Sequence, residues 1–179
     1  MKLSKIYQTI LNDIKSVLDG IDPRQAEDFL EAVSSARRVY VSGSGRSLFV
    51  AKSFAQRLHQ CGLEAYASGD TNIPPAGSGD ILVACSSSGE TLHVLCAAER
   101  AGEAGCRVAA VTSSTSSRLA KSADMTVLAP MLASPEHPQP LGSLFEQSSL
   151  LFFDAVVLLL MERLGLGGDD LARRHGNLE

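Results

Sequence analysis

Hydrophobic positions in the first 36 residues repeat with the spacing of two amphipathic helices. One helical stripe collects five apolar residues separated by charged ones: Leu3, Ile6, Ile10, Ile14 and Val17. This spacing predicts a helix over residues 3–18. A second helix is expected over residues 23–36, because Asp22 and Pro23 are a typical cap and first-turn residue.

From residue 37 the pattern changes to short β-rich runs that alternate with helical segments. The expected strands are "RRVYVSG" (37–43), "EAYAS" (64–68), "DILVACS" (80–86), "RVAAVTS" (107–113) and "MTVLAP" (125–130). Helical segments such as 47–60 and 91–105 lie between them. This alternation predicts an α/β fold, a five-stranded parallel sheet flanked by helices on both faces in a flavodoxin-like, doubly wound arrangement.

The remainder of the chain contains a proline-rich connection and a long apolar helix. "PMLASPEHPQP" (130–140) is expected to form an exposed, mobile rim, followed by a helix over about 143–165 and a short polar tail. The most apolar stretch, 150–161, is about half of a bilayer span and carries Asp154, so we expect a buried helix. We expect one domain over residues 1–179, with amino-terminal helices to about 36, an α/β core over about 37–130 and a carboxyl-terminal helix and tail over about 141–179.

Composition and charge narrow the class of protein. With 45% hydrophobic and 20% charged positions, the chain has an ordinary globular composition. The net charge of −4 argues against a nucleic-acid or anionic-membrane partner, because such proteins use basic surfaces. The amino end lacks the continuous apolar core of a signal peptide.

The cysteines show no zinc-ligand spacing, so the expected state is buried free thiols: Cys61, Cys85, Cys96 and Cys106. Together with the amino end, they predict a cytoplasmic protein.

Polar loops follow four of the expected strands. They are "GSGRS" (43–47), "SGDTNIPP" (68–75), "SSSGET" (86–91) and "TSSTSS" (112–117). Small hydroxyls and free N–H groups at a helix start suit a phosphate, and ligands of open α/β sheets bind at the carboxyl ends of the strands. The alternative is that these Ser and Thr residues only cap helices and turns. Convergence of several loops at one edge favours an anion site.

The "GSGRS" loop does not have the spacing of a dinucleotide fingerprint or of a nucleotide-triphosphate loop. Its Arg46 lies in the first turn of an expected helix, where a cation opposes the helix dipole. An anionic partner is therefore expected. It is either a bound anion or a structural carboxylate such as Glu90.

At this point the chain resembles a known family. "GSGRS", "SSSGET", "QPLGSLFEQS" and "RRHGNLE" together are similar to the 6-phospho-3-hexuloisomerases of the sugar-isomerase (SIS) domain family. The resemblance implies an isomerase that interconverts D-arabino-hex-3-ulose 6-phosphate and D-fructose 6-phosphate in the ribulose monophosphate pathway of formaldehyde fixation. It also implies an enediolate intermediate, no cofactor and no metal, and a homo-oligomer, expected to be a dimer-of-dimers tetramer.

The resemblance also assigns residues. The phosphate-binding hydroxyls fall on Ser47, Ser86, Ser87, Ser88 and Thr91. The rest of the predicted binding segments comprises Ser42, Gly43, Gly45, Arg46, Gly89 and Glu90.

Two further residues are candidates for the chemistry. Glu146 matches the glutamate of the family's "LFE" segment and is the candidate base, but Ser143 to Glu146 is also an S-x-x-E capping box. His175 in the terminal "RHGNLE" is the second candidate, acting in a neighbouring subunit's site. The other histidines, His59, His93 and His137, are expected to be surface or packing residues.

Two other functions remain open from the sequence. One is a different isomerase of the superfamily, acting on a pentose or heptose phosphate. The other is a non-catalytic sugar-phosphate sensor, a class that usually carries a further domain.

Overall fold

A single parallel sheet forms the centre of the computed structural model, which describes residues 2–131 and 139–176. Its strand order is β2-β1-β3-β4-β5. The strands are β1 (Val39–Ser42), β2 (Ala65–Ala67), β3 (Ile81–Cys85), β4 (Arg107–Thr112) and β5 (Met125–Leu128). All four neighbouring pairs are parallel, with Val39 beside Ala65 and Ile81. The sequence prediction of a doubly wound, five-stranded parallel sheet is confirmed.

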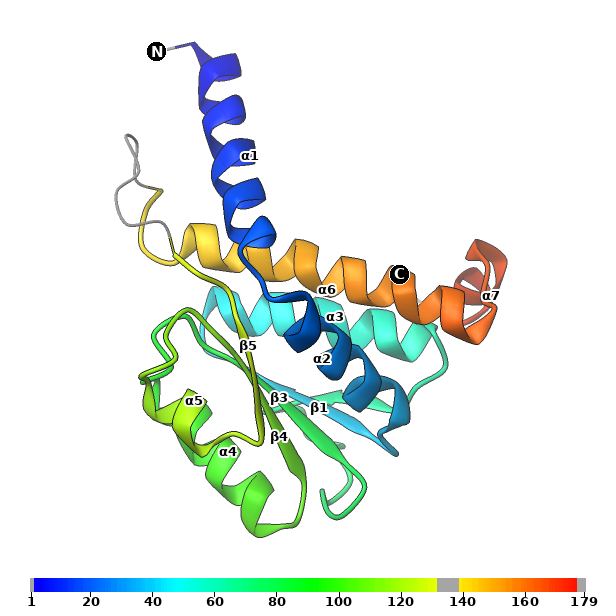
Figure 1. Cartoon of the computed structure of the whole chain (residues 1–179). Coiled ribbons are helices and arrows are strands. Elements are labelled where there is room, and N and C mark those ends of the chain that lie inside the picture. The colour runs from blue at the N-terminus through cyan, green and yellow to red at the C-terminus, as the bar shows by residue number, and fades with distance from the viewer. Residues whose placement is uncertain (1, 132–138, 177–179) are drawn as a thin grey trace.

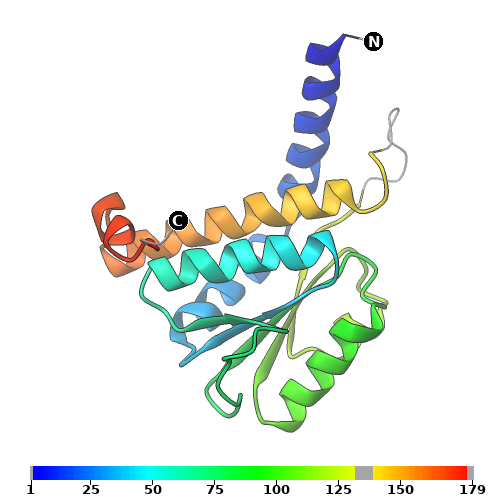
Figure 2. The ribbon, with the colours of Figure 1, turned by 180° about the vertical axis from the view of Figure 1, so that it is seen from behind.

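Helices cover both faces of this sheet (Figure 1). One face carries α2 (Pro23–Ser35), α3 (Arg46–Gln60) and α6 (Ser143–Leu164), and the other carries α4 (Leu92–Glu103) and α5 (Arg118–Ser122). The view from behind shows the same layers (Figure 2). As predicted, Asp22 caps α2 by accepting a hydrogen bond from the Arg24 N–H at 2.9 Å.

The strands divide their side chains between two apolar clusters, because successive residues of a strand point to opposite faces. Val39, Val41 and Val83 belong to the cluster under α2, α3 and α6, whereas Tyr40 and Leu82 belong to the cluster under α4. Phenylalanine rings join the helices of the first cluster. The closest pair is Phe54 of α3 and Phe153 of α6, with ring centroids 4.4 Å apart.

The long helix α6 is apolar on almost all sides. It is the one helix in the described part of the chain that is long and apolar enough to cross a membrane. Half of its most apolar window is buried inside the molecule, as in the core helix of a globular protein. Its outer side nevertheless exposes leucines, with Leu158 65% and Leu159 48% accessible.

The first helix, α1 (Leu3–Asp19), lies along the body only at its end. Ile14 and Val17 are buried, whereas Leu3, Tyr7 and Leu11 are more than half exposed. Figures 1 and 2 show the first turns projecting away from the rest of the molecule. The stripe predicted from the sequence is therefore covered only toward its carboxyl end.

Two short helices were missed by the sequence pattern. The segment expected as a polar tail contains α7 (Gly168–Arg173), whose Asp170 carboxylate accepts a hydrogen bond from the Gly167 N–H at 2.8 Å. Ser117 similarly caps α5 by accepting from the Ala120 N–H at 3.2 Å. Helices of five or six residues show too little periodicity to be read from a sequence. Most of the predicted proline-rich rim lies outside the described residues.

Candidate active site

The loop between β3 and α4 is shaped by its own hydroxyl groups. The hydroxyls of Ser86 and Thr91, at its two ends, lie 3.0 Å apart. Between them the chain turns at Gly89, whose φ of +63° favours glycine. The Gly89 N–H donates to both the carbonyl oxygen of Ser86 at 3.1 Å and its Oγ at 3.2 Å. The result is a compact turn that leads directly into the first turn of α4.

No side chain caps the amino end of α4. Thr91 is the N-cap residue, but its side chain makes no capping hydrogen bond with the helix. The first N–H groups of a helix have no partner within the helix and attract anions. The hydroxyls of the loop and the start of α4 thus form one set of donors suited to a phosphate.

A second tight turn joins β1 to α3. Gly45 has a φ of +55° and precedes α3 with no side-chain cap. Gly43 is buried, and a Cβ on it would lie 2.8 Å from the Leu48 backbone nitrogen. Small residues are therefore required where this turn packs against α3. Ser42, the last residue of β1, is fully buried, and its hydroxyl has no hydrogen-bond partner among the described residues.

These two turns meet at a pocket of about 410 Å³. It is lined by Ser44, Ser47, Cys85, Ser86, Ser87, Ser88, Thr91, Leu141 and Gly142. All five hydroxyl residues predicted to bind the phosphate lie in this lining. Ser42, Gly43, Gly45, Arg46, Gly89 and Glu90 do not line it, and the glycines among them shape the turns instead.

The loop after β4 supports the pocket from outside. The Ser87 carbonyl oxygen accepts hydrogen bonds from Thr112 Oγ1 at 3.0 Å and from Ser113 Oγ at 2.7 Å. Ser117 packs so closely on Gly89 that a Cβ there would lie 2.2 Å from the serine Oγ. The hydroxyl-rich loop 112–117 therefore fixes the Ser87 region, and none of its residues is in the lining.

Glu146 lies beside this pocket, on the first turn of α6. Its side chain is only 13% exposed, and its Oε2 forms an ion pair with Nε of Arg46, which is 67% exposed. A Cβ on Gly142, which lines the pocket, would lie 3.4 Å from Glu146 Oε1. The structure thus brings the candidate base to the edge of the hydroxyl-lined pocket.

The predicted capping box at Ser143–Glu146 is wrong. The N-cap residue is Gly142, and Ser143 is already the first residue of α6. The Ser143 hydroxyl donates to the Pro140 carbonyl oxygen at 2.8 Å, and the Glu146 carboxylate is paired with Arg46. Glu146 therefore makes no capping hydrogen bond, and its carboxylate lies in the first turn of α6 paired with Arg46.

The structural alternative for Arg46, a pair with a carboxylate of the protein, is what the structure shows, but the partner is Glu146 and not Glu90. Glu90 accepts hydrogen bonds from the Arg118 N–H and from Arg118 Nε, both at 2.8 Å. These bonds hold the pKa of Glu90 below its usual value. Glu90 links the phosphate loop to α5.

His175 lies far from Glu146 within one chain. It follows α7, which lies at the opposite end of α6 from Glu146 (Figure 1). The 22 residues of α6 span about 33 Å. Within one chain the two candidate catalytic residues are not brought together.

Of the remaining histidines and thiols that the structure describes, only Cys85 lines the pocket. His59 and His93 are exposed, as expected, and His137 lies outside the described residues. Cys61, Cys85 and Cys106 are buried free thiols, whereas Cys96 is exposed, contrary to expectation. Burial raises the pKa of Cys85 to about 12, so this lining thiol stays neutral. Among the described residues no cluster of His, Cys, Asp or Glu is arranged to hold a metal ion.

Sequence reasoning missed four lining residues. Ser44 and Cys85 adjoin predicted residues, so their places in the two turns were a usable signal. Leu141 and Gly142 precede α6 and are far from both turns in the sequence. Leu141 is fully exposed and has a φ of +52°, the only non-glycine residue in the described chain with a positive φ.

Comparison with known proteins agrees with this geometry. The model of the SIS domain matches residues 32–158. The chain belongs to the SIS-domain family. That SIS segment contains both turns, the pocket and Glu146.

Relatives in this SIS family extend over the whole chain. The 3-hexulose-6-phosphate isomerase of Bacillus subtilis is 36% identical and covers 100% of both proteins. The protein of the same name from Mycobacterium gastri is 35% identical, covering 95% of this chain and 88% of the relative. A solved Methanococcus jannaschii structure, from which a 3-hexulose-6-phosphate isomerase function was inferred, has a TM-score of 0.88 at 27% identity, covering 98% of this chain and 99% of that one.

Proposed function

We propose that the protein interconverts D-arabino-hex-3-ulose 6-phosphate and D-fructose 6-phosphate. The observation that carries this proposal is the position of Glu146 beside a pocket lined by five predicted phosphate-binding hydroxyls. The relatives named 3-hexulose-6-phosphate isomerase, which is the same activity, support it. Its place is the ribulose monophosphate pathway of formaldehyde fixation.

The phosphate group is held at the start of α4. Ser47, Ser86, Ser87, Ser88 and Thr91 supply hydroxyl donors, and the first turn of α4 supplies N–H groups. Hydroxyls bind a dianion without a fixed positive charge, which assists product release. Arg46, the exposed cation beside the pocket, adds attraction for the anionic substrate.

Glu146 is the base. Its carboxylate removes the proton from C2 of the 3-ulose, and the electrons of the C–H bond form the C2–C3 double bond while the C3 oxygen takes up charge. The resulting 2,3-enediolate collapses to a carbonyl at C2, and the proton returns to C3. A proton also passes between the C2 and C3 oxygens, so atoms and charges balance. The ion pair with Arg46 orients the carboxylate for this transfer.

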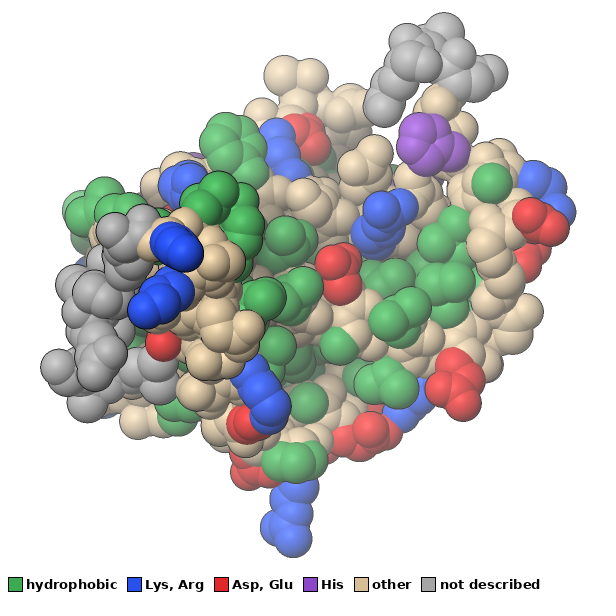
Figure 3. Space-filling model, turned by 90° about the horizontal axis from the view of Figure 1, so that it is seen from above, with side chains coloured by type: hydrophobic (Ala, Val, Ile, Leu, Met, Phe, Trp, Pro, Cys, Tyr) green, Lys and Arg blue, Asp and Glu red, His purple; other side chains and the backbone are tan. Residues whose placement is uncertain are grey.

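A homo-oligomer would complete the site, and we propose the dimer-of-dimers tetramer. In support, α1 exposes Leu3, Tyr7 and Leu11, and α6 exposes Leu158 and Leu159. The view from above shows hydrophobic side chains gathered along α6 (Figure 3). Burial of such surface drives association. In this assembly His175 would reach a neighbouring subunit's pocket, since it cannot reach its own.

Further parts of the proposal rest on the sequence. The chain forms one SIS-type domain, it acts in the cytoplasm, and its partners are small sugar phosphates. Neither nucleic acid nor membrane is a partner, and the reaction uses no cofactor and no metal.

Isotope exchange in D₂O tests the reaction. The protein, purified and treated with a chelator, is incubated with fructose 6-phosphate, and the sugar protons are followed by NMR. A 2,3-enediolate replaces the C3 proton with deuterium, so the C3 signal should disappear while the C1 signals persist. Loss of a C1 signal would indicate a 1,2-enediolate, and hence an aldose–ketose isomerase of fructose 6-phosphate, whereas binding without any exchange would indicate a sensor.

A further inference from the structure

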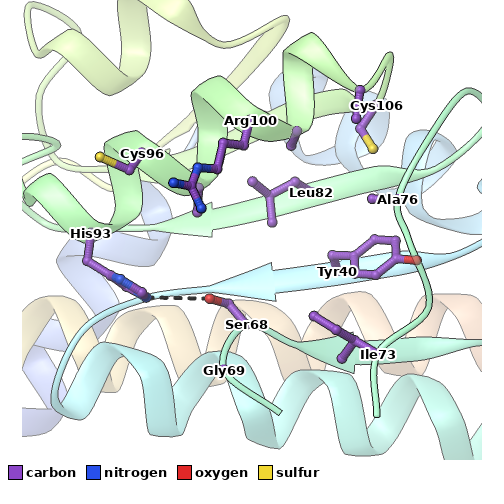
Figure 4. Close-up of a pocket in the computed structure, with 13 residues that line it drawn as sticks. Tyr40, Ser68, Gly69, Ile73, Ala76, Leu82, His93, Cys96, Arg100 and Cys106 are labelled. Atoms are coloured by element: carbon purple, nitrogen blue, oxygen red, sulfur yellow. Dashed lines mark hydrogen bonds between the residues drawn. The ribbon is translucent and has the colours of Figure 1, made fainter. Parts of the chain in front are cut away.

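A second hollow lies between α4 and the segment that follows β2, over β1 and β3 (Figure 4). The chain passes from β2 to β3 without forming a helix. On this face of the sheet, the space over β1 and β3 is therefore bordered by α4 on one side and only by residues 68–80 on the other. Its volume is about 430 Å³, within the range of small-molecule sites. None of its lining residues is shared with the phosphate pocket.

The walls of this hollow are mostly apolar. Along α4 the facing side chains are small at Ala97, Ala101 and Ala104, which leaves room above the sheet. The floor consists of Leu82 and the ring of Tyr40, which stacks on Tyr66 at a centroid distance of 5.7 Å. A flat apolar group would be buried between this floor and α4.

Most polar atoms in the hollow are already bonded within the protein. The Tyr40 hydroxyl donates to the Pro74 carbonyl oxygen at 3.2 Å, and the Cys106 thiol donates to the Gly77 carbonyl oxygen at 3.4 Å. A sugar, which needs many hydrogen-bond partners, is therefore poorly suited to it.

Two groups on α4 remain to recognise a ligand. The Arg100 guanidinium makes no hydrogen bond or ion pair with any residue that the structure describes, and Figure 4 shows it on the pocket side of α4, between His93 and Leu82. His93 Nε2 lies 3.4 Å from Ser68 Oγ and closes one end. The two are seven residues apart, about 10 Å along the helix.

The charge of the lining selects the ligand. None of the residues that line the hollow is Asp or Glu, although the whole chain carries a net charge of −4. Asp80, whose charge acts on the lining residues Tyr40 and Cys106, is already paired with Arg37. A cationic ligand would meet Arg100 with no compensating carboxylate. We propose that this hollow binds a small organic anion with a flat apolar body, whose carboxylate or phosphate pairs with Arg100.

Calorimetry with a matched pair of ligands tests this site. The ligands are 1-naphthoate and 1-naphthalenemethanol, which share the apolar body but differ in charge. Each titration is done without and then with excess fructose 6-phosphate, which occupies the phosphate pocket. The anion should bind about tenfold or more tightly than the alcohol, as expected for a charge-assisted contact.

Variants locate the binding. Arg100→Gln should bring the two affinities to within about twofold of each other, whereas Arg24→Gln, which removes an exposed arginine of α2, should leave the preference intact. Ala97→Leu, which fills the hollow, should weaken both ligands. Equal affinities in the unaltered protein, displacement by fructose 6-phosphate, or an unchanged preference in Arg100→Gln would overturn the proposal. A change of molecular mass in Ala97→Leu would overturn it in favour of a contact between copies of the chain.

Discussion

Replacing Glu146 by glutamine separates catalysis from structure at this position. The variant loses one ion pair, to an arginine that is 67% exposed, and such pairs contribute about 0–1 kcal/mol to stability. The glutamine oxygen can still accept a hydrogen bond from Arg46 Nε. No capping hydrogen bond is lost, because no side chain caps the start of α6 and the Glu146 carboxylate is paired with Arg46. The Tm should therefore fall by at most about 2–4 °C.

The expected effect on turnover is much larger. A neutral amide cannot take up the C2 proton near neutral pH, and loss of a general base typically lowers the rate by about 10²–10⁴-fold. This corresponds to about 2.7–5.5 kcal/mol of transition-state stabilisation. Substrate affinity should change little, because Glu146 is absent from the described lining of the phosphate pocket.

The assay compares Glu146→Gln with Arg46→Gln, which breaks the same ion pair but leaves the carboxylate. Thermal melts should be similar for the two variants. Exchange of the C3 proton in D₂O at saturating fructose 6-phosphate should be lost in Glu146→Gln but only reduced in Arg46→Gln, which keeps the carboxylate and loses the arginine that orients it. If Glu146→Gln exchanges the proton within tenfold of the unaltered rate, Glu146 is not the base. An equal loss of exchange in both variants would show that the effect of Glu146→Gln comes from breaking the ion pair and not from removing the base.

Three further predictions test the phosphate loop, the sheet and the assembly. Thr91→Val should weaken binding of fructose 6-phosphate and of inorganic phosphate by about 10–100-fold in calorimetry, with the melt unchanged; unaltered affinity would remove Thr91 from the site. Asp80 accepts hydrogen bonds from Arg37 Nε at 2.8 Å and Nη2 at 2.9 Å, and these bonds hold the pKa of Asp80 below its usual value. The pair therefore stabilises the fold fully above pH about 4, and this contribution is lost as the pH falls through the lowered pKa. Asp80→Asn should accordingly lower the Tm at pH 7 more than at pH 3, and an equal effect at both pH values would contradict the pairing. Leu158→Lys should reduce the mass measured by light scattering. Leu158 is 65% exposed in one chain, so a lysine there should not disturb the fold, but it would disrupt a contact with a second copy.

The position of the hydroxyl-rich loop between β3 and α4 could be predicted from the sequence because the information for it is local. An apolar strand, six polar residues and a helix lie consecutively, and their folded order follows from chain connectivity alone. Ser86 and Thr91 are five residues apart and meet through a hydrogen bond of 3.0 Å. The strands and longer helices were predictable for the same reason, since each carries its own periodicity.

The environment of Glu146 could not be predicted in this way. Its partner Arg46 is 100 residues earlier in the chain, and the pairing depends on how α6 lies across α3. The S-x-x-E pattern at Ser143 misled because a capping box requires the serine to precede the helix. Here the helix begins at Ser143 itself, and the serine hydroxyl bonds to Pro140.

The four polar loops show a similar limit. All follow parallel strands and therefore lie at one edge of the sheet, yet they do not share one role. Those after β1 and β3 line the phosphate pocket, and the one after β4 supports it through Thr112 and Ser113. The loop after β2 contributes Ser68 and Gly69 to the other hollow. Composition alone cannot distinguish a lining hydroxyl from a supporting one.

The strand order explains why the pocket forms between β1 and β3. The chain runs outward from β1 to β2 and then returns past β1 to β3, so α3 and α4 leave adjacent strands toward opposite faces. At such a switch point the two loops separate and leave a crevice. In the proposed site the α4 side supplies most of the phosphate donors, and the α3 side supplies Ser47 and Arg46, which meets Glu146 where α6 packs on α3. The donors of the α4 side and the proposed base thus come from different layers that meet at this crevice, so substitutions in the loop between β3 and α4 should alter affinity without displacing the base.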